Sequence, residues 1–182
     1  MSTWVLIFIA AAGCLFILKM VYVLSVAVVL PFTRGALYVS TSQRRIAAFL
    51  DAVPLQPGQV VIDLGCGDGR VLRRVPRRYG ARAIGYEMNP MAYVKARLFC
   101  LGTDGVSVRL RNFCKADLST ADVIFCYLFP DVMRELSGKL RRELKPGTTV
   151  VSCNFKLPQW LPDKVLRPGN SLHNDPIYIY IA

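Results

Sequence analysis

The chain has 182 residues, which is enough for one domain of ordinary size and a short appendage. Its 23 Lys and Arg residues outnumber 12 Asp and Glu residues, and the formal net charge of +11 favours an anionic partner surface such as nucleic acid or acidic lipid. The six cysteines are scattered, with no CxxC pair and no Cys/His cluster. Cysteine usage therefore argues against a metal centre and indicates reduced, mostly buried thiols.

The first predicted element is a membrane-spanning helix. No charged residue occurs from Thr3 to Leu18, and a second apolar run extends from Met20 to Phe32. About 20 apolar residues cross a hydrocarbon core of roughly 30 Å, so Trp4 to Leu30 is long enough. The positive leading region and the small-residue cleavage site of a signal peptide are missing. We therefore predict an uncleaved anchor over residues 1–32 and a second domain over residues 33–182.

Lys19 interrupts this apolar stretch, and an ammonium group is costly in the middle of a bilayer. Either the segment shifts so that Lys19 reaches an interface, or Lys19 faces a partner helix. Three arginines follow the segment: Arg34, Arg44 and Arg45. The positive-inside rule then places the second domain on the cytoplasmic side, or in an equivalent compartment such as the mitochondrial matrix.

A helix predicted over Gln43 to Val53 precedes a glycine-rich loop in residues 60–70, VVIDLGCGDGR. A β-branched strand ends there in Asp63, and three glycines follow at alternate positions: Gly65, Gly67 and Gly69. Glycine permits positive φ and lets a backbone approach a ligand. The DxGxGxG spacing differs from the GxGxxG of dinucleotide sites, and Asp63 suits a positively charged group. Cys66 lies inside the loop, where its side chain is expected to fill space beside the ligand.

The helix predicted over Gly69 to Tyr79 carries arginines at helical spacing on its outer side: Arg70, Arg73, Arg74, Arg77 and Arg78. Three interpretations of this stripe stay open: a helix face exposed to solvent, a contact for anionic lipid headgroups, or a contact for RNA. Pro76 is expected to kink the helix or to end its regular part.

Two acidic residues further along complete a ligand pattern. Glu87 ends the next apolar run, where an α/β unit places a side chain that accepts both hydroxyls of a ribose. Asp117, in KADL, follows a third run and is expected to accept a proton from an adenine amino group. Ribose, adenine and a cationic amino-acid group together describe S-adenosylmethionine. This order of motifs resembles the class I methyltransferases from Val53 to about Phe155.

The remaining segments alternate between helix and strand. Helices are predicted over Asn89 to Leu101 and Asp131 to Leu144, with Asn89 and Asp131 as caps. Strands are predicted over residues 107–110, 122–128 and 148–155, and a hairpin over residues 164–167 and 177–181. The predicted fold class is α/β, a Rossmann-like, seven-stranded, mostly parallel sheet with a C-terminal antiparallel hairpin, preceded by the transmembrane helix.

The segment after the fourth predicted strand bears on the identity of the methyl acceptor. Enzymes that methylate base amines often carry Asn/Asp-Pro-Pro-aromatic there, whereas this chain has Tyr127-Leu128-Phe129-Pro130. No cysteine pair for C5 chemistry is evident either. Both observations disfavour a nucleic-acid base as the acceptor.

Several segments together resemble one group of methyltransferases: the anchor, YVSTS at residues 38–42, DLGCGDGR, GYEMNP, KADL, FPDVM with ELKPGT, and CNFKLPQW. The likeness, which runs to Trp160, is to the membrane-anchored protein-lysine methyltransferases that modify the adenine nucleotide translocase and the ATP synthase c subunit, and to their bacterial relatives. Ser40 precedes Thr41 where that family usually has proline.

The resemblance implies in-line methyl transfer to a neutral lysine amine, with Tyr127 or Tyr38 orienting the amine as the catalytic residues. It implies cofactor contacts from Thr41, Asp63, Gly65, Cys66, Gly67, Glu87 and Asp117. Asn154, Phe155 and Trp160 are candidates for the acceptor channel.

The predicted function is therefore S-adenosylmethionine-dependent methylation of a lysine on a membrane protein, with the lipid bilayer as a partner and no metal or nucleic acid. Two alternatives stay open. One is a methyltransferase that acts on RNA or on a lipid or small hydrophobic molecule, and the other is a non-catalytic membrane adaptor with the same fold.

Overall fold

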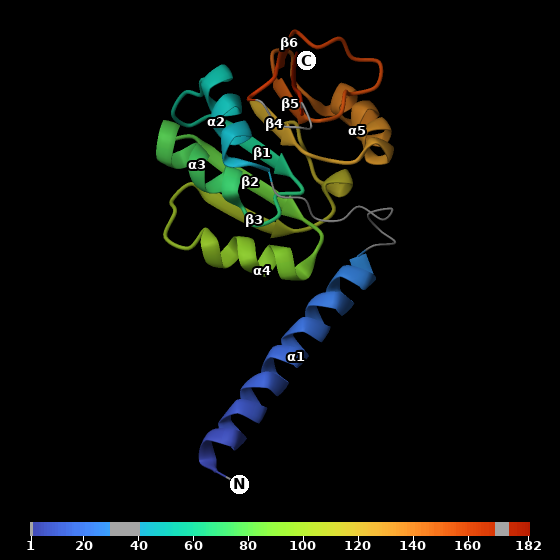
Figure 1. The fold of residues 1–182 in the computed structure, drawn as a ribbon. Coiled ribbons are helices and arrows are strands. Elements are labelled where there is room, and N and C mark those ends of the chain that lie inside the picture. Colours follow the sequence, from blue (N-terminus) through green and yellow to red (C-terminus); the bar gives the residue numbers. More distant parts are fainter. Residues whose placement is uncertain (1, 30–40, 170–174) are drawn as a thin grey trace. The chain divides into compact units, whose positions relative to one another are not determined.

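The computed structural model describes residues 2–29, 41–169 and 175–182, and contacts divide the chain into two units, Met1–Leu37 and Tyr38–Ala182. In the first unit α1 runs from Thr3 to Val29 (Figure 1). Its segment Thr3–Ser25 is the one helix among the described residues that is long and apolar enough to cross a membrane. The expected domain boundary at 32/33 lies outside the described residues.

The second unit is built on a seven-stranded sheet in the order β3-β2-β1-β4-β5-β7-β6. Five strands are parallel: β1 (Val60–Leu64), β2 (Arg82–Glu87), β3 (Val106–Leu110), β4 (Val123–Cys126) and β5 (Thr149–Cys153). The last strand, β7 (Ile177–Ile181), lies antiparallel between β5 and β6 (Lys164–Leu166). The predicted α/β fold with a C-terminal antiparallel hairpin is confirmed.

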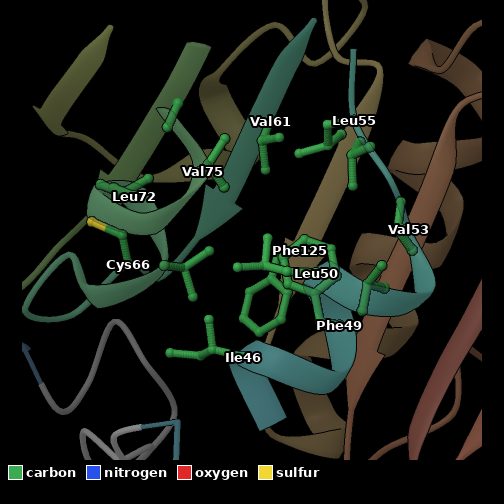
Figure 2. Packing of buried hydrophobic residues seen from close by; sticks show 14 of the residues in the cluster. Ile46, Phe49, Leu50, Val53, Leu55, Val61, Cys66, Leu72, Val75 and Phe125 are labelled. Carbon is green, nitrogen blue, oxygen red and sulfur yellow. The ribbon is translucent and has the colours of Figure 1, made fainter. Parts of the chain in front are cut away.

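Helices cover both faces of the sheet because alternate strand residues point to opposite sides. The face that includes Val61 packs against α2 (Gln43–Ala52), α3 (Arg70–Tyr79) and α4 (Pro90–Phe99). The face that includes Ile62 packs against α5 (Pro130–Glu143) and a 3₁₀ turn, η1 (Phe113–Lys115). Figure 2 shows Phe49 of α2 meeting Phe125 of β4 in the first core, with ring centroids 5.0 Å apart.

One helix end agrees with the sequence prediction and one differs. The helix α3 ends at Tyr79 as predicted and continues through Pro76, so the proline does not end it; Gly80 follows in a left-handed conformation, with its N–H donated to the Pro76 oxygen at 2.8 Å. The cap of α5 is Phe129 rather than Asp131, since Pro130 takes the first helical position, where its fixed φ is favourable. Asn89 caps α4 as predicted, and its Oδ1 accepts from Met91 N at 2.9 Å.

Candidate functional site

The predicted site residues converge where β1 and β4 are neighbours and the strand order reverses. The connection after β1 returns the chain to β2, whereas β4 leads away to β5. In open α/β sheets the crevice outside the carboxyl ends of the strands at such a point is where ligands bind. The loop after β1 and the residues after β2 and β4 all lie at this edge.

The glycine loop folds tightly against the end of β2. The backbone N–H groups of Gly65 and Cys66 both donate to the Tyr86 oxygen, at 2.9 and 3.1 Å. Gly65, Gly67 and Gly69 have φ values of 78°, 56° and 71°, a region that residues with a Cβ rarely adopt. At Gly65 an added Cβ would also lie 3.3 Å from Leu128 beyond β4. The loop therefore requires glycine for both its conformation and its close approach to β4.

Gly85 in the middle of β2 is a supporting residue that the motif analysis missed. A Cβ added there would lie 2.5 Å from Leu72 Cδ1 and 2.7 Å from Cys66 Sγ. The absence of a side chain at Gly85 lets the first turn of α3 and the loop settle on the sheet. The signal available in the sequence was a glycine inside a strand pattern, which often marks close packing.

Glu87 is held by backbone donors from two directions. Its Oε2 accepts from Gly67 N at 2.9 Å, and its Oε1 accepts from Met88 N and Asn89 N, both at 2.8 Å. These three hydrogen bonds hold the Glu87 carboxylate in place beside the glycine loop. An immobilised carboxylate is suited to accept hydrogen bonds from a pair of neighbouring hydroxyls, as predicted for a ribose.

Asp63 is almost fully buried, with 3% of its surface exposed. Burial, with a smaller contribution from the negative charges of Glu87 and Asp68, raises its pKa to about 8. A carboxyl group in this position favours the approach of a cation, because a nearby positive charge would stabilise its ionised form.

A second charge cluster ties the glycine loop to the segment before α2. Arg70 donates to both carboxylate oxygens of Asp68, at 2.9 and 2.6 Å, and to the Thr41 backbone oxygen at 2.9 Å. Burial raises the pKa of Asp68, but the hydrogen bond and charge of Arg70, with the charge of Arg73, outweigh it and leave the pKa below its ordinary value. Thr41 is buried and is linked to the loop through Arg70, a contact between residues 29 positions apart that the sequence motifs did not predict.

Cys66 lies in the glycine loop and is buried beside Leu72 (Figure 2). Burial raises the pKa of its thiol, so the group stays protonated. Its structural contribution in the described protein is packing, which matches the space-filling role expected for it.

Asp117 is not brought to this edge. It is exposed, its Oδ1 accepts from Ser119 N at 2.9 Å, and it lies near the charge of Lys145 beyond the end of α5. The 3₁₀ turn η1 carries the chain away after β3. Asn112, which precedes η1, lies instead two residues beyond the register partner of Glu87, and its Oδ1 accepts from Cys114 N at 2.8 Å.

A polar cluster lies beyond the ends of β4 and β5. Asn154 Nδ2 donates to the Tyr127 hydroxyl oxygen at 3.1 Å, and the guanidinium of Arg45 lies 5.4 Å from the centre of the Tyr127 ring. Arg45 also forms an ion pair with Asp175. Phe129 and Phe155 stack nearby with ring centroids 6.4 Å apart. Tyr38, the other predicted catalytic residue, lies outside the described residues.

Asn154 has two unusual properties. Its φ is 69°, in the left-handed region, and its Oδ1 is buried with no hydrogen-bond partner among the described residues. A buried acceptor without a donor costs free energy unless a ligand supplies one. Backbone strain and a buried acceptor without a hydrogen-bond donor, both at one residue beside Tyr127, are features of a binding group.

The described residues contain no group of three or more His, Cys, Asp or Glu side chains that could hold a metal ion.

The similarity to known proteins covers the same part of the chain. Residues 63–164 match the family model described as the ANTKMT methyltransferase domain. The chain is 32% identical over 149 residues to a protein-lysine N-methyltransferase of Saccharolobus islandicus, covering 79% of this chain and 92% of that one. It is 34% identical to the mouse adenine nucleotide translocase lysine N-methyltransferase, covering 72% of this chain and 58% of the mouse protein.

A solved structure is similar as well. The Salinibacter ruber protein described as an RNA methyltransferase in complex with S-adenosyl-L-homocysteine superposes with a TM-score of 0.72 and 34% identity. The match covers 79% of this chain and 93% of that protein.

Proposed function

Because the chain belongs to the ANTKMT methyltransferase family, a group of class I S-adenosylmethionine-dependent enzymes, we propose that it methylates a lysine side chain of a membrane protein. The observation that carries the proposal is the pairing of two sites at one sheet edge. A glycine loop with a fixed carboxylate, Glu87, lies beside a polar cluster around Tyr127. The first suits the methyl donor and the second suits an amine acceptor.

The donor end is assigned to the loop and the residues that support it. S-adenosylmethionine, when bound, supplies a methyl group from a positively charged sulfonium. Glu87 would hold the ribose hydroxyls, and the buried Asp63 would face the cationic amino-acid part. Gly65 and Gly67 leave room for the ligand against the backbone. An added Cβ at Gly65 would lie 3.3 Å from Leu128, so glycine supports the proposal by keeping the loop backbone close to the residues beyond β4.

Three further residues are assigned to the cofactor site from their positions. Asn112 follows the end of β3 by two residues, and β3 ends at Leu110, the register partner of Glu87, so we assign Asn112 the adenine contact that the sequence pattern gave to Asp117. Thr41 and Cys66 would close the loop from either side, the first through Arg70 and the second by packing.

The acceptor end is assigned to Tyr127 and Asn154. A lysine ammonium must lose a proton before its nitrogen can attack, because its ordinary pKa is about 10.4. The Tyr127 oxygen and the Asn154 Oδ1, which has no partner among the described residues, would each accept an N–H of the amine and so align its lone pair. The stacked rings of Phe129 and Phe155 would exclude water around the aliphatic stem of the lysine. Tyr38 is retained as a second candidate for the same role.

The membrane part of the proposal rests on α1. We propose that residues 1–32 form a single-pass anchor and residues 33–182 the catalytic domain, on the cytoplasmic or matrix-equivalent side. An anchor confines enzyme and acceptor to one plane and so raises their effective concentration without a new contact. A protein acceptor in that membrane is the substrate class that benefits.

Membranes incubated with methyl-labelled S-adenosylmethionine test the proposal. We expect label on a membrane-embedded protein, at lysine, when the full chain is added. A form lacking residues 1–32 should label the same acceptor far more slowly while binding the cofactor equally well. Equal labelling by both forms would refute the tethering role, and label found only in lipid would refute the protein acceptor.

RNA is the second candidate acceptor, because the similar Salinibacter protein is described as an RNA methyltransferase and the chain is strongly basic. Loss of the labelled product on nuclease treatment would favour this candidate. Tyr127-Leu128-Phe129-Pro130 lacks the motif that enzymes of base amines often carry, which makes a lysine the better supported acceptor.

A further inference from the structure

The helix α4 presents an apolar stripe to solvent. Val94 and Leu98 lie four residues apart on one face of α4 and are 47% and 59% exposed, and Leu101, 69% exposed, follows in the turn just after the helix ends. The opposite side of the helix holds the buried Ala96 and Cys100, which pack toward α3 and the glycine loop. A helix of a soluble domain normally turns its apolar stripe inward, so this stripe indicates an external apolar partner.

Positive charges lie near the stripe. Lys95 and Arg97 are exposed on α4 itself, and Arg111 is exposed just after β3, with one acidic residue, Asp104, exposed in the same part of the chain. Arg109 points to the other face of the sheet, where its Nη1 donates to the Tyr86 hydroxyl at 3.3 Å. Lys95 Nζ and the Arg73 guanidinium lie 5.6 and 5.2 Å from the centre of the half-exposed Phe99 ring. Apolar side chains with cations around them match the two layers of an anionic bilayer surface.

The strand beside this helix extends the same surface. The strand β3 is the outermost of the sheet on this side, and α4 lies along it (Figure 1). Leu110 is 51% exposed and stands between Arg109 and Arg111. We define residues 90–101 and 106–111 as the β3-edge surface.

We propose that the β3-edge surface lies on the headgroups of an anionic lipid bilayer, with Val94, Leu98 and Leu101 inserted at the boundary with the acyl chains. The proposal rests on the proposed role of α1 as the anchor of the same chain. Eleven residues separate Val29 from Thr41, so the chain can span at most about 40 Å between them. A domain held so near a bilayer is within reach of a second, weaker lipid contact.

RNA fits this surface less well. Proteins recognise single-stranded RNA largely by stacking bases on aromatic rings and arginine planes. The most exposed apolar residues of the β3-edge surface are aliphatic, and its one exposed ring, Phe99, already lies against Arg73 and Lys95. Leucine side chains between cations are typical of an interfacial lipid contact.

Photo-crosslinking of the full chain in nanodiscs tests the proposal. The discs contain phosphatidylcholine with or without phosphatidylglycerol, and each lipid carries a diazirine near its headgroup. Crosslinked peptides are mapped by mass spectrometry. We expect label in α1 in every disc and label in residues 90–111 only when phosphatidylglycerol is present.

Matched charge reversals make the test specific. Lys95→Glu with Arg97→Glu should lower the label in residues 90–111 about tenfold and leave the α1 label unchanged. Arg134→Glu with Arg142→Glu, on α5 at the other face of the sheet, should change neither. Leu98→Ser should lower the label without changing the charge. Cofactor binding by each variant checks that it is folded.

Label in α1 with none in residues 90–111, or equal label there in discs without phosphatidylglycerol, would overturn the proposal. So would protection of residues 90–111 by added RNA in place of lipid. Methyl transfer measured on the same discs separates the two ideas. A sample that shows the expected lipid crosslinks but no methyl transfer would refute the proposed function and leave the lipid contact standing.

Discussion

Asp63 makes a quantitative prediction about cofactor binding. In the free protein burial raises its pKa to about 8, so at pH 7 only about one molecule in ten carries the ionised carboxylate. If the cationic end of the ligand requires that carboxylate, the apparent affinity is the intrinsic affinity multiplied by the ionised fraction. Affinity should then rise about tenfold per pH unit below pH 8 and level off above it.

The assay is calorimetric titration of S-adenosyl-L-homocysteine, which retains the amino-acid group, into the full chain from pH 6 to pH 9. Binding at pH 7 should release close to one proton, seen as a dependence of the heat on the ionisation enthalpy of the buffer. Asp63→Asn keeps the shape of the side chain and removes its ionisable group, so the pH dependence of affinity in this variant reports the titration of the ligand alone. The affinity of the wild type should depend more steeply on pH, and the difference is the contribution of Asp63.

The reasoning is refuted if wild type and Asp63→Asn have parallel pH profiles, or if affinity in the wild type falls as pH rises towards 8. The same group affects stability with a definite sign. Its folded pKa lies above the ordinary value of 3.8, so its favourable contribution is complete below about pH 4 and is lost as pH rises to about 8. The thermal midpoint of Asp63→Asn, measured relative to that of the wild type, should therefore increase as the pH rises from 5 to 8.

Three further changes test other parts of the site. Glu87→Ala should abolish measurable cofactor binding by calorimetry while Glu87→Gln retains part of it, because the amide keeps one acceptor oxygen; unchanged affinity in the alanine variant would remove Glu87 from the site. Gly85→Ala should lower the free energy of unfolding by about 1–3 kcal/mol, since its Cβ would press on Leu72 and Cys66, and denaturant titration with no loss would contradict the packing argument. Asn154→Gly keeps the left-handed backbone at no strain, so stability should be unchanged or higher and cofactor affinity unchanged, while the rate of methyl transfer to lysine falls at least tenfold; full activity would exclude its side chain from acceptor binding.

The fold and the donor side of the site were accessible to prediction because they depend on local rules. Short continuous apolar and β-branched runs located the core strands, and the spacing of Asp63, Gly65 and Glu87 follows from how a strand, a turn and a helix must succeed one another. The structure brings these residues together, and Asn89 begins α4 as expected. Their proposed contacts with the cofactor remain predictions.

The rest depends on contacts between distant segments. The link from Arg70 to Thr41 spans 29 residues, and the pair formed by Tyr127 and Asn154 spans 27, so neither follows from a motif. Asp117 was selected because it follows a strand in sequence. Only the geometry shows that η1 intervenes and that Asn112 occupies the position at the strand end.

The placement of β7 between β5 and β6 has a consequence for how the protein is made. The strand β6 is translated before β7, yet it has no partner in the sheet until β7 has formed, because β6 bonds to β7 and not to β5. Until β7 has paired with it, β5 has an open edge. An unpaired strand edge can pair with another polypeptide, so this side of the sheet is the one most exposed to misassembly during folding.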